Sequence, residues 1–187
     1  MEEWNPDLQP EDFPPELRAL LVEDVAELRD SFEQVQALWA ATIERARSLP
    51  EAKLHQSVDG QWSFVRTLRH LIYAIDTWVG RMIRAEEHPF HRWGQPFSEY
   101  EDATRDLGLD LDAEPSLDEV LAVHAERVQG VRDLLAGFSN TDLDQICVPD
   151  DTIHPTEPHS VRSCLWTVVE EAWWHHRFAE RDLATLG

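Results

Sequence analysis

The chain has 187 residues, of which 42% are hydrophobic, a size and composition typical of one globular domain. Its 37 acidic and 16 basic residues give a formal net charge of −21, which argues against binding to nucleic acid or anionic membranes, because both attract clustered Lys and Arg. No apolar run is long enough to span a membrane, and the N-terminus lacks the basic and apolar regions of a signal peptide. We therefore expect a cytoplasmic protein in which Cys147 and Cys164 are reduced thiols.

The first half of the chain contains two predicted helices, in which apolar residues recur at spacings of three and four. Residues 1–14, with three prolines and five acids, are expected to form an irregular arm ahead of a single domain over residues 15–187. The first helix spans about 15–48, with a break near Val22–Val25, and Pro50 follows its end. The second spans about 63–87 and ends before Pro89.

The second half contains two further helices. Ser116 and Glu119 match the capping-box pattern, which predicts the start of a helix over about 117–136. A loop rich in Asp and Pro follows, and the last helix spans about 159–185. We find no strand alternation and no internal repeat. The expected fold class is therefore all-α, a four-helix bundle.

The lengths of the connections predict the order of the helices. About fourteen residues separate the first two helices, which favours an antiparallel pair. The 28 residues at 88–115 are enough to run back along a bundle of about 30 Å, so that the third helix is parallel to the second. The predicted topology is up-down-down-up.

Three histidines lie at or beside the inner faces of these helices: His70, His124 and His175. His70 and His124 are each roughly 11 Å from the start of their helices, and His175 is roughly 15 Å from the end of its own. In the up-down-down-up order all three lie near the same end of the bundle. In a simple up-down-up-down order, His70 and His175 would lie at opposite ends.

Glu171 and His175 are four residues apart and therefore share one face of the last helix. Together with His70 from the second helix they are candidate ligands for Zn²⁺, Ni²⁺ or Fe²⁺, and three ligands leave coordination positions open. We prefer His175 to the neighbouring His176 because only His175 has a glutamate four residues before it. The residues alone also fit histidines that are simply packed in the core, and both interpretations stay open at this point.

Three stretches make the chain recognisable: GQWSFVRTLRHLIYAIDTWV, HPFHRWGQP and CLWTVVEEAWWHHRFAERDL. They resemble the actinobacterial branch of the DinB-like superfamily, and the resemblance covers most of residues 50–187. It implies a DinB/YfiT-like up-down-down-up bundle with a metal triad, onto which His70, Glu171 and His175 map. The last pair is often His-x-x-x-His in the superfamily, so a carboxylate replaces one imidazole here.

Characterised relatives in that superfamily include thiol S-transferases that use bacillithiol or mycothiol. The resemblance thus implies a metal-dependent thiol S-transferase or hydrolase, with a divalent metal and a low-molecular-weight thiol as cofactors. The expected partners are a small-molecule substrate and a second copy of the chain in a homodimer. His124 is expected to face the cavity as a catalytic acid or base. The alternative is a bundle that binds metal or a small ligand without catalysis.

Overall fold

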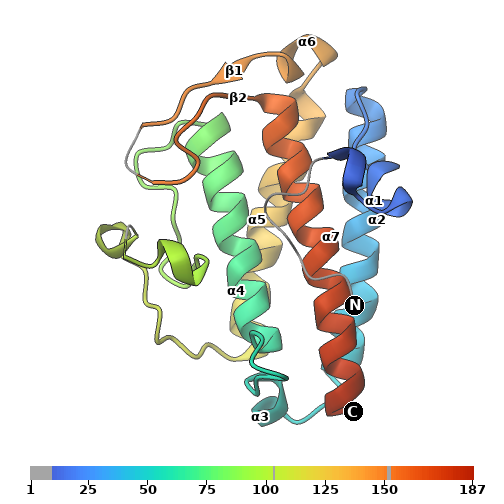
Figure 1. Ribbon diagram of the computed structural model, residues 1–187, viewed down its shortest axis with the longest axis vertical. Coiled ribbons are helices and arrows are strands. Elements are labelled where there is room, and N and C mark those ends of the chain that lie inside the picture. Colours follow the sequence, from blue (N-terminus) through green and yellow to red (C-terminus); the bar gives the residue numbers. More distant parts are fainter. Residues whose placement is uncertain (1–9, 103, 151–152) are drawn as a thin grey trace.

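The computed structural model describes residues 10–102, 104–150 and 153–187 and consists mainly of helices (Figure 1). The longer helices are α2 (Val25–Ala46), α4 (Phe64–Ile75), α5 (Leu117–Gly137) and α7 (Val161–Leu186), and the short ones are α1 (Pro15–Arg18), α3 (Glu51–Leu54) and α6 (Asn140–Leu143). Short 3-10 helices span Pro10–Asp12, Ser98–Tyr100 and Arg105–Leu107. The predicted all-α fold is confirmed.

The helix starts follow from local hydrogen bonding. The Ser63 hydroxyl accepts a hydrogen bond from the backbone N–H of Arg66 at 3.2 Å and caps α4. At the start of α5, Ser116 and Glu119 form the capping box expected from the sequence, in which the Glu119 carboxylate accepts from the Ser116 N–H at 2.8 Å. Asp24 caps α2, which is why the first predicted helix is divided into α1 and α2.

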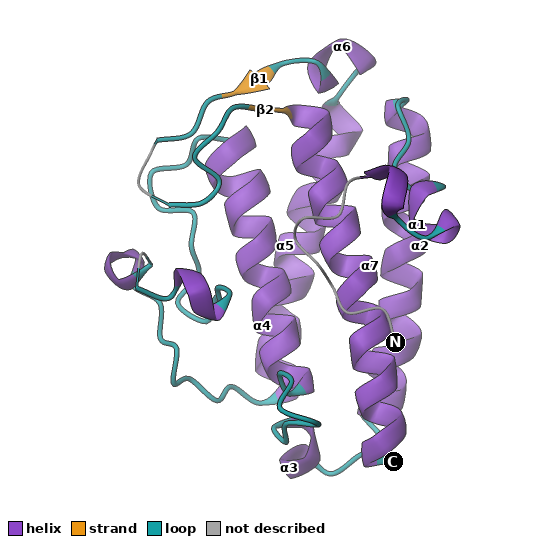
Figure 2. Cartoon of the chain, viewed as in Figure 1, coloured by secondary structure: helices purple, strands orange, loops and turns teal. Residues whose placement is uncertain are grey.

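Two further details differ from the sequence-based expectation. A two-stranded antiparallel sheet pairs β1 (Ile146–Cys147) with β2 (His159–Ser160), so α7 begins two residues later than predicted (Figure 2). A π-helical segment, Asp76–Ile83, extends α4, and the Arg84 N–H donates to the carbonyl of Val79, five residues before it. Of the predicted N-terminal arm, residues 1–9 lie outside the described residues.

Contacts between helix ends give the directions of the helices. The Leu117 N–H at the start of α5 donates to the carboxylate of Glu51 at 2.7 Å, and the Lys53 ammonium donates to the carbonyl of Leu186 at the end of α7. At the other end, the Val25 N–H donates to the side chain of Asn140, just after α5, at 2.8 Å. Hence α4 and α5 both start at the end where α3 lies, whereas α2 and α7 both finish there (Figure 1).

Helix α4 lies at the centre of the packing that forms the site. It contacts α5 and α7, and eleven of its twelve residues are buried. A long connection from α4 to α5, residues 84–116, runs beside α4 (Figure 1) and is described except for residue 103; we call it the crossing connection. A helix enclosed in this way is apolar almost all round, so a polar residue within it needs partners.

None of the helices in the described ranges combines the length and the apolar character that a membrane-crossing segment requires.

Candidate metal centre

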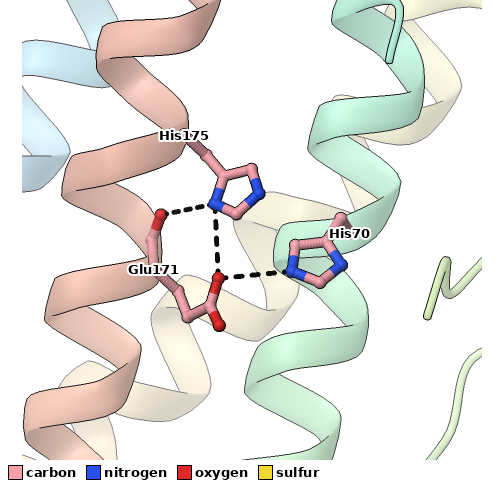
Figure 3. A group of neighbouring side chains, drawn as sticks. All are labelled: His70, Glu171 and His175. Carbon is pink, nitrogen blue, oxygen red and sulfur yellow. Dashed lines mark hydrogen bonds and ion pairs between the residues drawn. The ribbon is translucent and has the colours of Figure 1, made fainter. Parts of the chain in front are cut away.

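The three predicted ligands meet between α4 and α7 (Figure 3). His70, Glu171 and His175 each offer one ligand atom, and these atoms all lie within 4.8 Å of one another. The Glu171 carboxylate oxygen Oε2 is 3.3 Å from Nε2 of His70 and 3.3 Å from Nδ1 of His175. The structure thus brings together residues from two helices that are about a hundred positions apart in sequence.

Helix geometry explains this arrangement. Glu171 and His175 are one turn apart on α7, so both side chains project from the same face. That face packs against α4, where His70 lies five residues before the last residue of the helix. All three side chains are removed from solvent, with exposed fractions of 1% for His70, 8% for Glu171 and 4% for His175.

Backbone carbonyls determine which ring nitrogens carry hydrogen. Nδ1 of His70 is 2.8 Å from the carbonyl oxygen of Gln95, and Nδ1 of His175 is 2.8 Å from the carbonyl oxygen of Glu171. A carbonyl oxygen can only accept, so each Nδ1 donates its hydrogen. In the neutral rings the lone pair is therefore on Nε2, the usual arrangement of histidines that bind a metal ion.

The electrostatics of the triad favour a cation. Burial lowers the pKa of His70, because desolvation disfavours the imidazolium form. Burial alone would raise the pKa of Glu171, but the facing imidazoles of His175 and His70 outweigh it and hold that pKa below its usual range. The ionised carboxylate of Glu171 thus lies 3.3 Å from Nε2 of His70. A positive ion between these atoms would satisfy both, so the donor set fits a divalent metal.

Aromatic rings enclose the two imidazoles. The ring of Trp62 lies 4.8 Å from that of His70 and 6.1 Å from that of His175, and Phe97 lies 4.3 Å from His70 (centroid distances). Trp62 also lines a pocket of about 450 Å³ together with polar residues such as Arg66. Trp62 is thus in contact with both the pocket and the metal-ligand candidates, a role that its position before α4 did not reveal in the sequence.

The structure separates His175 from its neighbour. The Nε2 atom of His176 is 2.9 Å from the hydroxyl of Thr42 on α2, and its ring packs edge-on against Trp39. His176 therefore joins α7 to α2, on a different side from the triad. This placement agrees with the preference for His175 over His176.

His124 is buried in α5, and burial lowers its pKa to about 4. The hydrogen bonds and ring contacts given above for the triad do not include it. The expected catalytic role of His124 therefore stays a prediction. Gln95, whose carbonyl holds His70, was not among the candidate residues, because a backbone contact from a long connection leaves no signal in the sequence.

Comparison with known proteins identifies the family of the chain that carries this site. The model of the DinB superfamily matches residues 34–179, a range that contains α4, α5 and all three residues of the triad. The curated proteins and the solved structures gave no match. The matched range spans most of the chain and agrees with the resemblance found in the sequence. The chain belongs to the DinB superfamily.

Proposed function

We propose that the chain binds one divalent metal ion, Zn²⁺, Ni²⁺ or Fe²⁺, through Nε2 of His70, Nε2 of His175 and the carboxylate of Glu171. One observation carries this proposal: His70, Glu171 and His175 are buried and each offers a ligand atom within 4.8 Å of the others, while backbone carbonyls lie 2.8 Å from Nδ1 of both histidines. A neutral-imidazole pair with one carboxylate is a common ligand set for these metals.

We further propose that the bound metal serves thiol S-transfer to a small electrophile. A divalent ion in this ligand set would keep a net positive charge and would favour a low-molecular-weight thiol in its thiolate form. The thiol gives up its proton, its sulfur forms a bond to an electrophilic carbon, and the leaving group departs with the bonding electrons. His124 is the residue that we propose to accept or return the proton, from its buried position in α5.

The alternative is metal or small-ligand binding without catalysis. The observation that favours it is the enclosure of the triad, since Trp62 and Phe97 pack directly against His70. A metal held under these rings would act structurally, by joining α4 to α7. Assay of the metal-loaded protein with a thiol and an electrophile separates the two functions, because only the first forms an S-conjugate.

The metal proposal is tested with a matched pair of histidine variants. The protein is stripped with a chelator, reloaded with Zn²⁺ or Ni²⁺, and its metal content is measured by elemental analysis after removal of free ion. We expect about one ion per chain in the wild type and in His176→Gln, and none in His175→Gln or His70→Ala. The proposal is wrong if His175→Gln and His70→Ala retain the ion, or if the wild type binds none.

His124 is tested separately from the ligands. His124→Gln should keep the metal content of the wild type and lose most of the S-conjugate formed per unit time. Equal rates in His124→Gln and wild type would make it a packing residue.

A further inference from the structure

A buried arginine next to His70 holds the backbone of the crossing connection. The guanidinium of Arg69 donates to four carbonyl oxygens: from Nε to Trp93 at 2.9 Å, from Nη1 to Leu111 at 3.3 Å and to Ala113 at 2.5 Å, and from Nη2 to Asp110 at 2.6 Å. One side chain thus joins two separate parts of the crossing connection, near residue 93 and near residues 110–113.

Arg69 is suited to this task by its charge and shape. It is only 3% exposed, and a buried cation is stable only when its donors are satisfied. The guanidinium has five N–H donors in a rigid plane, whereas the ammonium of lysine has three donors on a single atom. The four carbonyls therefore match an arginine, and a lysine could satisfy only some of them.

The segment held by Arg69 contains the partner of His70. The backbone N–H of Gln95 donates to the carbonyl of Arg69 at 3.2 Å, and the carbonyl of Gln95 accepts from Nδ1 of His70 at 2.8 Å. Gln95 is fully buried, two residues after the Trp93 carbonyl that Arg69 binds. The position of the Gln95 carbonyl is thus fixed by the backbone of Arg69 on one side and, through Trp93, by its guanidinium on the other.

We propose that Arg69 is a positioning residue of the metal centre: by holding the crossing connection through four carbonyls, it keeps the Gln95 carbonyl against Nδ1 of His70. That hydrogen bond selects the ring tautomer with hydrogen on Nδ1 and leaves Nε2 free as a ligand. The inference rests on the proposed metal site for its effect on affinity, but the tautomer itself is a property of the metal-free protein. Loss of such a partner of a ligand histidine typically weakens metal binding by about 10- to 100-fold.

The test compares Arg69→Met and Arg69→Lys with Arg29→Met. Arg29 is a matched control, because it also holds carbonyls of a distant segment, those of Leu135 and Phe138, but at the other end of the bundle. Zn²⁺ affinity is measured by competition with a chromophoric chelator, and the His70 tautomer by ¹⁵N NMR of the metal-free protein, with His70→Gln to assign the signal. Far-ultraviolet circular dichroism shows whether each variant is folded.

We expect Zn²⁺ to bind about 10- to 100-fold more weakly to the Arg69 variants, with a smaller loss for Arg69→Lys than for Arg69→Met. We also expect the His70 nitrogen signals to shift toward a mixture of tautomers, while Arg29→Met matches the wild type in both measurements. If Arg69→Met does not fold, Arg69→Lys decides. Wild-type affinity and an unchanged His70 tautomer in a folded Arg69 variant would overturn the inference. If the wild type binds no Zn²⁺, the proposed function fails, and the NMR measurement still decides the role of Arg69.

Discussion

The Nε2 atom of His70 on α4 lies 3.3 Å from Oε2 of Glu171 on α7, although 101 positions separate the two residues. Both side chains are buried, and His70 keeps its neutral ring because burial lowers its pKa. The contact therefore brings a ring nitrogen and a carboxylate together away from water, where the buried negative charge needs a proton or a metal cation beside it. This relationship makes the junction of α4 and α7 the place where substitutions are most informative.

Glu171→Gln should separate charge from shape at this junction. The amide has nearly the same size as the carboxylate but is neutral and a poor ligand. We therefore expect Zn²⁺ affinity to fall by more than about 100-fold, which exceeds the loss caused by removing a residue that only hydrogen-bonds to a ligand. Glu170→Gln is the control, because burial already raises the pKa of Glu170 to about 8 and keeps that acid largely protonated at pH 7. Isothermal titration calorimetry of both variants gives the comparison. Equal affinity of Glu171→Gln and wild type would exclude Glu171 as a ligand.

Metal binding should stabilise the folded chain. A ligand at 100 times its Kd that binds only the folded state adds about 2.7 kcal/mol to the free energy of unfolding, which corresponds to roughly 5–10 °C in Tm for a chain of this size. Differential scanning calorimetry with Zn²⁺, and again after addition of a chelator, measures this shift. His176→Gln should show it and His70→Gln should not. If none of the proposed metals changes the Tm of the wild type, the proposed metal site is wrong.

Stability should fall in mild acid because of His124. Burial lowers its pKa to about 4 from an ordinary value of 6.5, so between these values the unfolded chain binds a proton that the folded chain does not. This effect is absent well above pH 6.5 and costs about 2 kcal/mol by pH 5. In urea titrations, His124→Leu should lose about that much less stability between pH 7 and pH 5 than wild type does.

The exposed His88 provides the control for that measurement, since 89% of its side chain is in contact with solvent. His88→Gln should keep the wild-type dependence on pH. An identical pH dependence of His124→Leu and wild type would show that His124 titrates normally and is not desolvated in solution.

The capping box of α5 offers a test of local energetics away from the site. Ser116→Ala removes the hydroxyl that accepts from the Glu119 N–H, and such losses cost about 0.5–2 kcal/mol. In a double-mutant cycle with Glu119→Ala, the two effects should not add, because the residues bond each other reciprocally. Urea titration of the four proteins measures the coupling. Strict additivity would mean that the reciprocal bonds are absent in solution.

The helices and the triad could be predicted because their signals are periodic. Apolar spacing marked the four long helices, and the pattern of Ser116 and Glu119 gave the start of α5 to the residue. The spacing of four between Glu171 and His175 placed both on one face, and the inner position of His70 placed it on a facing helix. In each case the spacing of the residues along a regular helix determines the face from which their side chains project.

The remaining features depend on irregular backbone and could not be predicted in this way. The carbonyl oxygen of Gln95 contacts His70 from the crossing connection. Every residue has such a carbonyl, so the residue type at position 95 gives no sign of this contact. Trp62 and Phe97 cover the imidazoles from outside the periodic segments. The β1–β2 pair is too short to produce a visible alternation. Such contacts depend on the path of a loop through space, which residue types alone do not specify.

The placement of two candidate ligands one turn apart on α7 has a consequence for ion selectivity. The spacing of their backbones is set by the rise of a single helix, so the approach of His70 from α4 is the main variable that can adapt to ions of different radius. The distance between α4 and α7 would then determine the metal–ligand distances, and the flexibility of a binding loop would not. Buried apolar residues of the two helices, such as Leu68 on α4 and Leu165 on α7, would help to set how closely these helices pack, and changing their bulk would shift the preference from one cation to another without any change in the ligands.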